Sequence, residues 1–402
     1  MCVFDPQLPR QQLPAIAQSA FIYLDNAATT PMPQAVIDTL INHHTQQVGN
    51  VHRGQHQAGQ ATTLAFEQAR QTVANFINAT SKDEIIWTRG TTESLNLIAN
   101  LYGQSHLSPK DEILISIEEH HANFVPWQQI VQQTGATLRI LPHSIDEYWD
   151  QEAFENAVNA NTKIVALAHI TNVLGNQRPI KRIIEKAHQV GAIVVLDGAQ
   201  GIQHEHIDVQ ALEVDFYVFS GHKLFGPTGI GVLYGKYQYL ESLPPWQFGG
   251  KMVKKVTVEG TQFAPPPARF EAGTPNIGGA LALASAIQWH QQWDHHAVQA
   301  HINRLHQQLH QGLSQIDGVK ILSLKANQSG ILTFIVEGEH PDDIATLLDQ
   351  QRIILRSGHH CTHPLHNALK VKGTLRFSLA LYNTEDDVNK AIHAVQTACN
   401  LF

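Results

Sequence analysis

Between residues 84 and 235, short apolar runs alternate with longer segments whose apolar positions recur every three or four residues. Runs that are apolar at nearly every position are typical of strands buried on both faces, as in a parallel sheet covered by helices. The segment Pro179–Val190, ended by Gly191, has the spacing of a covering helix and a glycine stop signal. The pattern therefore predicts an α/β fold whose strands are Ile85–Thr88, Ile113–Ile117, Thr137–Leu141, Ile164–Ala168, Ala192–Leu196, Phe216–Phe219 and Ile230–Leu233.

The pattern changes after residue 248. Residues 249–275 contain paired glycines, a strand-like segment and a run of prolines, which predicts an excursion, with a hairpin, from the edge of a large domain. Further on we expect helices at 277–292, up to about 316, at 342–350 and from Thr384, and strands at 331–336, 352–355 and 374–379. A chain of 402 residues suits two domains. We expect a large α/β domain over 20–290 and a smaller α+β domain from 1–19 and 291–402.

The composition argues against a nucleic-acid-binding, a membrane-spanning and a disulfide-rich secreted protein. The net charge of −8 and the lack of a basic patch argue against a nucleic-acid surface. No apolar stretch approaches the roughly 18 residues that a membrane span needs. The cysteines (Cys2, Cys361 and Cys399) are too few for a disulfide framework, and prolines and glutamines interrupt the amino-terminal residues where a secretory signal would lie. These features predict a cytoplasmic protein.

The 25 histidines are concentrated partly in a polar helical stretch that includes His290, His295, His296, His301, His306 and His310. A metal site is conceivable there, but no compact ligand spacing stands out. We interpret this stretch as the solvated face of a helix and expect no metal.

Polar side chains follow four of the predicted strands. His120, Asn172, Asp197 and Lys223 come shortly after the runs at 113–117, 164–168, 192–196 and 216–219. Because ligands of open α/β sheets bind at the carboxyl ends of the strands, these side chains are candidates for one shared site.

Together these residue types are what pyridoxal phosphate requires. A lysine carries the cofactor, a buried carboxylate pairs with the pyridine nitrogen, and a further site anchors the phosphate. Lys223 and Asp197 suit the first two roles, and Ser220 and His222 lie where they could contact the phosphate. The hydroxyl-rich turn at 89–94 opens a helix and could bind phosphate too, although it could equally be only a well-capped helix.

Nine blocks of sequence carry a resemblance to a known family. They are YLDNAATT (23–30), VHRG (51–54), RGTTESLN (89–96), EHHAN (119–123), DGAQ (197–200), SGHKLFGPTGIG (220–231), RFEAGTPN (269–276), RSGHHC (356–361) and LRFSLALYNT (375–384). In this order they resemble the cysteine desulfurases, which are class V aminotransferase-like enzymes of PLP fold-type I. The short HHC-x-x-P-L segment is similar to the group-II branch, which includes SufS-type desulfurases and cysteine sulfinate desulfinases.

The resemblance implies a role for each matching residue. Lys223 would carry the cofactor, His120 would stack on its ring, and Asp197 and Gln200 would bind the pyridine nitrogen and the phenolic oxygen. Thr91, Thr92, Ser220 and His222 would hold the phosphate, with Thr274 added by the neighbouring subunit of a homodimer. Asn172, Arg376 and Arg356 would hold the substrate carboxylate, and a guanidinium suits a carboxylate because it can grip it bidentately.

Cys361 is the residue that would separate a cysteine desulfurase from other relatives. The resemblance implies that it takes sulfur from L-cysteine, which leaves L-alanine and a persulfide. The persulfide would pass to a SufE-type acceptor protein for iron–sulfur cluster assembly or other sulfur metabolism. Cysteine sulfinate and selenocysteine are further possible substrates. Arg356, His359 and His360 could lower the pKa of the thiol, and the alternative is a structural cysteine.

Some positions depart from the family pattern, namely Thr362, His363, Lys251 and the proline run at 265–267. We expect them to lie near the sulfur exit, without touching the cofactor site, and to affect partner choice. Two other functions stay open. An aminotransferase or a kynureninase-like enzyme would need Lys223 and Asp197 but not Cys361, and a sulfur-relay protein would need no catalysis.

Overall fold

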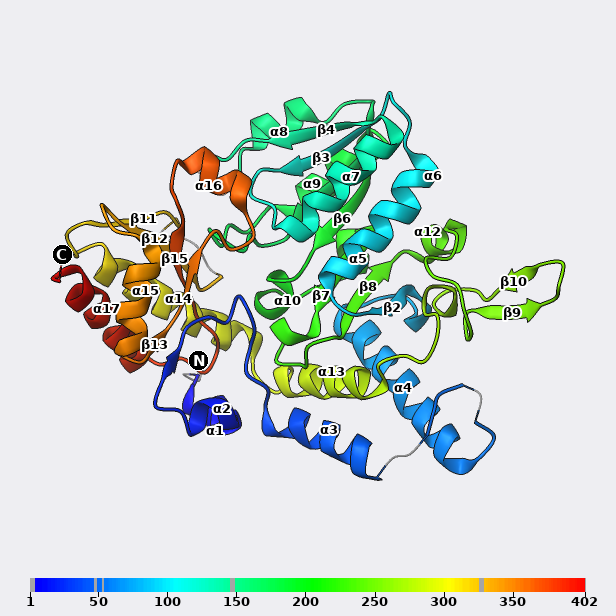
Figure 1. Ribbon diagram of the computed structural model, residues 1–402, viewed down its shortest axis with the longest axis horizontal. Coiled ribbons are helices and arrows are strands. Elements are labelled where there is room, and N and C mark those ends of the chain that lie inside the picture. The colour runs from blue at the N-terminus through cyan, green and yellow to red at the C-terminus, as the bar shows by residue number, and fades with distance from the viewer. Residues whose placement is uncertain (1–3, 47–48, 53, 145–148, 325–328, 402) are drawn as a thin grey trace.

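The structure is a computed structural model that describes residues 4–46, 49–52, 54–144, 149–324 and 329–401. Figure 1 shows two bodies, a larger one around a central sheet and a smaller one that contains the carboxyl terminus. Over the described ranges, no helix combines the length and the apolar character needed to cross a membrane.

The central sheet has seven strands, and their order places the predicted strand ends beside one another. The order is β2 (Ile85–Thr88), β8 (Gly231–Gly235), β7 (Phe216–Ser220), β6 (Ile193–Asp197), β5 (Thr162–Ala168), β3 (Glu112–Ser116) and β4 (Thr137–Leu141). Strand β8 is antiparallel to both of its neighbours, and the other pairs are parallel. The predicted α/β fold with a mainly parallel sheet is confirmed.

Helices cover both faces of this sheet because successive strand residues point in opposite directions. Val194 and Leu196 of β6 belong to a core with α4 (Gln57–Phe76), α9 (Ile180–Gln189) and α13 (Ile277–His290). Ile193 and Val195 belong to the opposite core, with α5 (Thr91–Ile98), the π-helical η2 (Ala99–Gly103) and α7 (Val125–Thr134). The expectation that every strand is buried on both faces is wrong for β4, in which only Leu141 is buried. The edge position alone does not expose a strand, because β2, at the opposite edge of the sheet, is buried throughout.

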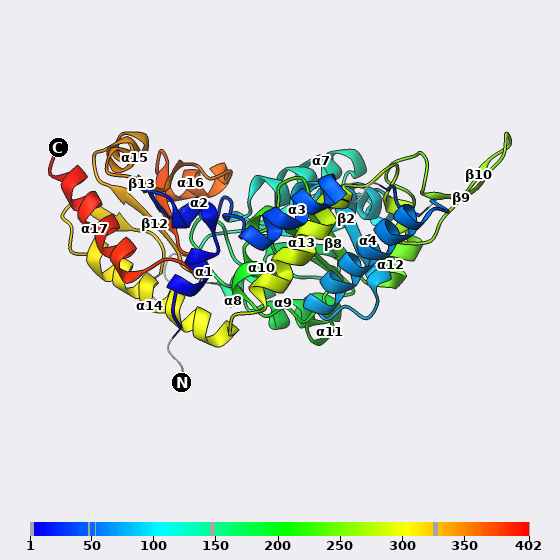
Figure 2. The same ribbon diagram turned by 90° about the horizontal axis from the view of Figure 1, so that it is seen from below.

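The smaller body has its own hydrophobic core. A four-stranded antiparallel sheet, in the order β11 (Val319–Ile321), β12 (Ile331–Val336), β15 (Thr374–Ser378), β14 (Arg356–Gly358), packs with α14 (His295–Leu313), α15 (Pro341–Gln350) and α17 (Glu385–Cys399). Leu13, between α1 (Gln7–Gln11) and α2 (Pro14–Ala17), joins this core, and Figure 2 shows both helices beside the smaller body. The domain boundaries at residues 20 and 290 stay a prediction.

One expectation for the smaller body is confirmed and another is wrong. The strand expected at 352–355 is present as β13 (Ile353–Ile354), which pairs with β1 (Ile22–Tyr23) and lies outside the four-stranded sheet. On α14, which we expected to present a solvated histidine face, His301 and His306 are buried, with 2% and 0% of their surface exposed. The cause is that α14 packs against β12 and α17.

The remaining elements connect these layers. They are α3 (Gln34–Gln46), η1 (Lys82–Glu84), α6 (Gln104–His106), η3 (His121–Asn123), α8 (Gln151–Ala157), α10 (Gly201–His204), α11 (Val209–Leu212), η4 (Gly221–Lys223), α12 (Tyr237–Ser242), β9 (Val253–Val256), β10 (Thr261–Phe263), η5 (Ala268–Phe270) and α16 (His363–Leu369). Strands β9 and β10 form an antiparallel hairpin that projects from the end of the larger body farthest from the carboxyl terminus (Figures 1 and 2).

Candidate active site

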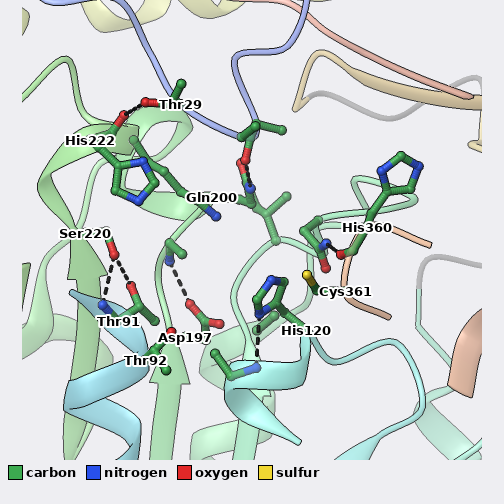
Figure 3. Close-up of a pocket in the computed structure, with 18 of the residues that line it drawn as sticks. Thr29, Thr91, Thr92, His120, Asp197, Gln200, Ser220, His222, His360 and Cys361 are labelled. Carbon is green, nitrogen blue, oxygen red and sulfur yellow. Dashed lines mark hydrogen bonds between the residues drawn. The ribbon is translucent and has the colours of Figure 1, made fainter. Parts of the chain in front are cut away.

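A cavity of about 390 Å³ lies where the two bodies meet, at the carboxyl ends of the parallel strands. The larger body lines it with the turns after β2, β3, β5, β6 and β7, and the smaller body adds Arg356, His360, Cys361 and Arg376. Figure 3 labels several of the lining side chains around the hollow, among them His120, Asp197 and Cys361. Of the predicted site residues it contains Thr91, Thr92, His120, Asn172, Asp197, Gln200, Ser220, His222, Lys223, Arg356, Cys361 and Arg376.

Lys223 and Asp197 place opposite charges in the buried part of the cavity. Lys223 ends the η4 turn directly after β7, and burial lowers the pKa of its amine to about 8 although Asp197 opposes this. Asp197 ends β6 with 5% of its surface exposed, and burial raises the pKa of its carboxyl group. The Asp197 Oδ1 accepts a hydrogen bond of 2.9 Å from the Ala199 N–H, which fixes the carboxylate.

A small polar cradle lies between the start of α5 and the end of β7. The Ser220 Oγ accepts a hydrogen bond of 2.8 Å from the Thr91 N–H and lies 2.9 Å from the Thr91 hydroxyl. A Cβ on Gly90 would meet the Ser220 Oγ at 3.1 Å, and its φ of 155° favours glycine there. Thr92 and His222 complete the lining, and burial lowers the pKa of His222 to about 4. Hydroxyl groups beside a helix amino terminus suit a phosphate group.

His120 approaches the cavity from the turn after β3. Burial, followed by the charge of Lys223, lowers the pKa of its imidazole to about 3. Its Nδ1 accepts a hydrogen bond of 3.0 Å from the Ala122 N–H, so this nitrogen carries no proton. A neutral ring held in this way can stack on a flat aromatic cofactor.

The residues that fix this turn were missed by the sequence analysis. Glu119 is fully buried, forms an ion pair with Arg178, and accepts hydrogen bonds from the Asn123 side chain (2.6 Å) and from the Ala168 N–H (2.8 Å). It therefore links the turn of His120 to the end of β5. The block EHHAN contains Glu119, but nothing in the sequence pairs it with Arg178.

Arg376 and Arg356 share a carboxylate that the sequence analysis also missed. The Asp25 carboxylate lies 3.2 Å from Arg376 Nη2 and 3.0 Å from Arg356 Nε. Arg376 is buried and its Nη1 donates a hydrogen bond of 2.8 Å to the Asn172 carbonyl. Its Nε is buried without a hydrogen-bond partner among the described residues. Because Arg376 also lines the cavity, its guanidinium suits a carboxylate bound there.

Cys361 is exposed at the cavity, on the turn between β14 and α16. Figure 3 shows its sulfur near the ring of His120. His360 and Cys361 both have left-handed backbone conformations, with φ of 48° and 56°. The Asn172 side chain donates a hydrogen bond of 2.8 Å to the His360 carbonyl, and the His121 N–H donates one of 2.8 Å to the Cys361 carbonyl.

Thr274 lies outside this cavity. It lines a separate hollow with Asn50, Gly250, Lys251 and other residues, and its hydroxyl accepts a hydrogen bond of 3.4 Å from Asn50. Its expected role from a neighbouring subunit stays a prediction. Arg53, in the block VHRG, lies outside the described residues.

Lys251 and Thr362, two of the departures from the family pattern, contact buried residues. Lys251 forms an ion pair with the buried Glu271. Thr362 is fully buried, and its hydroxyl donates to Asn172 Oδ1 at 3.3 Å. The expectation that none of these positions touches the predicted site is therefore wrong for Thr362, because the turn of Cys361 folds back onto the end of β5.

The described residues fit pyridoxal phosphate. The cavity combines an amine of lowered pKa, a buried carboxylate, a hydroxyl cradle and a neutral imidazole. These groups suit the carbonyl carbon, the pyridine nitrogen, the phosphate and the ring of this cofactor.

Comparisons with known proteins agree with this site. The family "Aminotransferase class-V" matches residues 22–391. A probable cysteine desulfurase of Vibrio cholerae is 52% identical over 396 residues, which cover 98% of each chain. The cysteine desulfurase CsdA of Escherichia coli is 43% identical over 401 residues, covering 100% of this chain and 99% of the relative.

Solved structures give the same result. The crystal structure of Escherichia coli CsdA, in an S-sulfonic acid form, has a TM-score of 0.93 and 41% identity and covers 100% of both chains. An apo cysteine desulfurase of Thermococcus onnurineus has a TM-score of 0.95 and 33% identity, covering 100% of this chain and 99% of its own. The chain therefore belongs to the pyridoxal-phosphate enzymes of aminotransferase class V and, within them, to the cysteine desulfurases.

Proposed function

We propose that this chain removes sulfur from L-cysteine, with Lys223 carrying pyridoxal phosphate and Cys361 receiving the sulfur. The observation that carries the proposal is that the amine of the half-buried Lys223 and the exposed thiol of Cys361 line one cavity. A cofactor-carrying lysine alone would suit an aminotransferase or a kynureninase-like enzyme. A thiol in the same cavity favours sulfur transfer.

The cofactor would be held by groups from several strand ends. Asp197 would pair with the pyridine nitrogen, and Gln200, which is buried and anchored to the Ala27 carbonyl at 2.8 Å, would reach the phenolic oxygen. Thr91, Thr92, Ser220 and His222 would hold the phosphate, and His120 would lie over the ring. When bound, pyridoxal phosphate supplies an electron sink that weakens bonds to the substrate α-carbon.

Substrate orientation would come from the arginines of the smaller body. The Arg376 guanidinium, which lines the cavity, would receive the carboxylate of cysteine, assisted by Arg356 and Asn172. The amine of Lys223 has a pKa of about 8, so part of it is neutral near neutral pH and its Nζ can take the α-proton of the substrate.

Sulfur transfer would follow at Cys361. Its Sγ, as the thiolate, attacks the sulfur of the bound cysteine, and the bond between Cβ and sulfur breaks. The electron pair of that bond stays with the carbon skeleton, which takes up protons and leaves as alanine. The transferred sulfur ends as the outer atom of a persulfide on Cys361.

A test compares Cys361→Ser with Cys399→Ser. Cys399 lies on α17 and is half-buried, away from the cavity, so it provides a matched control. We expect Cys361→Ser to lose release of alanine from L-cysteine and Cys399→Ser to keep it. Lys223→Ala should lose both the turnover and the visible absorbance of the bound cofactor. Full turnover by Cys361→Ser would refute the proposal, and keto-acid production in its place would indicate an aminotransferase.

Other substrates test the role of the thiol. Cysteine sulfinate and selenocysteine carry leaving groups that need less help from a thiolate. Cys361→Ser should therefore keep much of its activity on these two while losing activity on cysteine. Equal loss on all three substrates would contradict the role of Cys361 as sulfur acceptor.

The proposal includes a homodimer and an acceptor protein. Thr274 faces a hollow outside its own active cavity, which supports its use by a second copy. Mixing Lys223→Ala with Thr274→Val should then restore activity, because a heterodimer would contain one site that has neither change. No restoration in a proven heterodimer would exclude this arrangement. Cysteine turnover with and without a SufE-type protein tests the acceptor, and the cytoplasmic setting stays a prediction.

A further inference from the structure

The turn that carries Cys361 is conformationally unusual. His360 and Cys361 are consecutive residues with φ of 48° and 56°, in the left-handed region that side chains with a Cβ disfavour. Such a pair persists only where surrounding contacts stabilise it. The contacts that hold this turn therefore decide where the thiol lies.

Asn172 and Thr362 provide these contacts on the cavity side. The Asn172 Nδ2 donates a hydrogen bond of 2.8 Å to the His360 carbonyl, and the Thr362 hydroxyl lies 3.3 Å from both Asn172 Oδ1 and that carbonyl. Thr362 has none of its surface exposed. Because both polar atoms of the Asn172 amide are engaged, the amide has a single favourable orientation.

The outer side of the turn is held separately. The His121 N–H donates to the Cys361 carbonyl at 2.8 Å, and the His363 N–H donates to His121 Nε2 at 3.2 Å. The His360 ring lies 2.9 Å from the Thr374 hydroxyl. A change at Thr362 would leave these bonds in place, so it should shift the turn without unfolding it.

Asn172 also belongs to the substrate-binding side. Its backbone carbonyl accepts the hydrogen bond from Arg376 Nη1 at 2.8 Å, and its side chain lines the cavity. The same residue thus contacts the proposed carboxylate site and the proposed sulfur acceptor. An altered amide orientation would change the distance between these two sites.

We propose that Thr362 is a positioning residue, whose hydroxyl fixes the Asn172 amide and thereby holds Cys361 in line with the sulfur of the bound substrate. This inference rests on the proposed function. Thr362 is not among the described residues that line the cavity, and it acts through Asn172 and the left-handed turn. Its loss should affect the step that needs the thiolate and leave steps that do not need it unchanged.

The test uses the cofactor-loaded enzyme and three variants. Thr362→Val keeps the shape and removes the hydroxyl, Thr362→Ser keeps the hydroxyl, and Cys361→Ser reports on the proposed function itself. We expect Thr362→Val to lower kcat for cysteine roughly threefold to tenfold, as for one lost hydrogen bond. Its kcat for cysteine sulfinate should be unchanged, and Thr362→Ser should restore cysteine turnover.

A second readout follows the thiol directly. In a Cys2→Ser, Cys399→Ser background, the rate at which iodoacetamide alkylates Cys361 should change in Thr362→Val and return in Thr362→Ser. Should Thr362→Val fail to fold, Thr362→Ala takes its place in the same measurement.

The outcomes distinguish a failure of the positioning role of Thr362 from a failure of the proposed desulfurase function. The inference is overturned if Thr362→Val and Thr362→Ser are impaired alike, if cysteine and cysteine sulfinate lose activity equally, or if neither turnover nor alkylation changes. In each of these cases Cys361→Ser would still lose cysteine turnover. If Cys361→Ser keeps that turnover, the proposed function fails instead.

Discussion

The buried carboxylate of Glu271 provides the sharpest test of the forces that stabilise the larger body. Glu271 lies beyond the hairpin, and its two oxygens accept hydrogen bonds from Arg70 at 2.6 and 3.0 Å. Lys251 Nζ lies 3.1 Å from Oε2, and the Trp87 N–H donates to Oε1 at 2.9 Å. Burial raises the pKa of Glu271, but Arg70 and Lys251 outweigh this and hold it below its ordinary value.

Glu271→Gln is the informative change because it keeps the shape. The Nε2 of the glutamine would replace Oε2 and would face two other donors, Arg70 Nη2 and Lys251 Nζ. The side chain of Arg70 is 1% exposed, so its charge could not be solvated. Removing one partner of a buried ion pair costs about 3–5 kcal/mol.

This loss of stability corresponds to a measurable decrease in the Tm. At about 2.1 cal/mol/K per residue, the entropy of unfolding of the 402-residue chain is about 0.8 kcal/mol/K. Glu271→Gln should therefore lower the Tm of the cofactor-loaded enzyme by about 4–6 °C in calorimetry at a fixed scan rate. Glu155→Gln is the matched control, since its ion pair with Arg182 is exposed and its loss should shift the Tm by less than about 1 °C.

A double-mutant cycle completes the test. Arg70→Met combined with Glu271→Gln should lose less stability than the two single changes added together. Glu271→Gln leaves the buried charge of Arg70 with the weaker partner Glu67, 3.5 Å away, and Arg70→Met removes that charge. Additive losses, or a Glu271→Gln shift as small as that of the control, would refute this reasoning.

Two further predictions concern stability. Burial lowers the pKa of His169 to about 4, of His204 to about 3 and of His306 to about 4. Below about pH 6.5 these histidines are protonated in the unfolded chain but stay neutral in the folded protein. As the pH falls from about 6.5 to about 4, the free energy of unfolding should therefore decrease by about 1.4 kcal/mol per pH unit for each histidine. Urea unfolding at pH 7 and pH 5.5 measures this, and equal free energies would contradict it. Thr384→Ala should cost about 1 kcal/mol, since the Thr384 hydroxyl caps α17 by accepting from the Asp387 N–H at 3.1 Å, and Thr384→Ser should restore it.

The part of the site on the central sheet could be predicted from the sequence. Parallel strands bring their carboxyl ends to one edge, so Asp197 and Lys223 had to lie near each other once their strands were recognised. The pattern could not reveal how far helices cover each strand, so the exposure of β4 was missed, whereas β2, at the other edge of the sheet, is buried as expected.

The contacts that complete the site could not be predicted in this way. Asp25 reaches Arg376 because its backbone forms a bridge with Ser378 of β15, more than three hundred positions later in the chain. Glu119 follows β3 and Arg178 follows β5, and the two side chains form an ion pair. No local feature of the sequence predicts this contact. His301 looked like a solvated residue because its burial depends on which face of α14 meets α17.

The residues on the central sheet could be predicted and the contacts that complete the site could not, because the two parts of the cavity are built differently. Lys223 and Asp197 belong to neighbouring strands of one sheet, so their separation is fixed by a rigid core. Cys361 belongs to the smaller body, and its position relative to Lys223 depends on contacts that cross between the two bodies. Asn172 makes two of these contacts, through its carbonyl to Arg376 and through its amide to the His360 carbonyl. The step that binds the cofactor thus depends on the sheet, whereas the step that moves sulfur depends on a few hydrogen bonds between the bodies, and single substitutions at those bonds should separate the two.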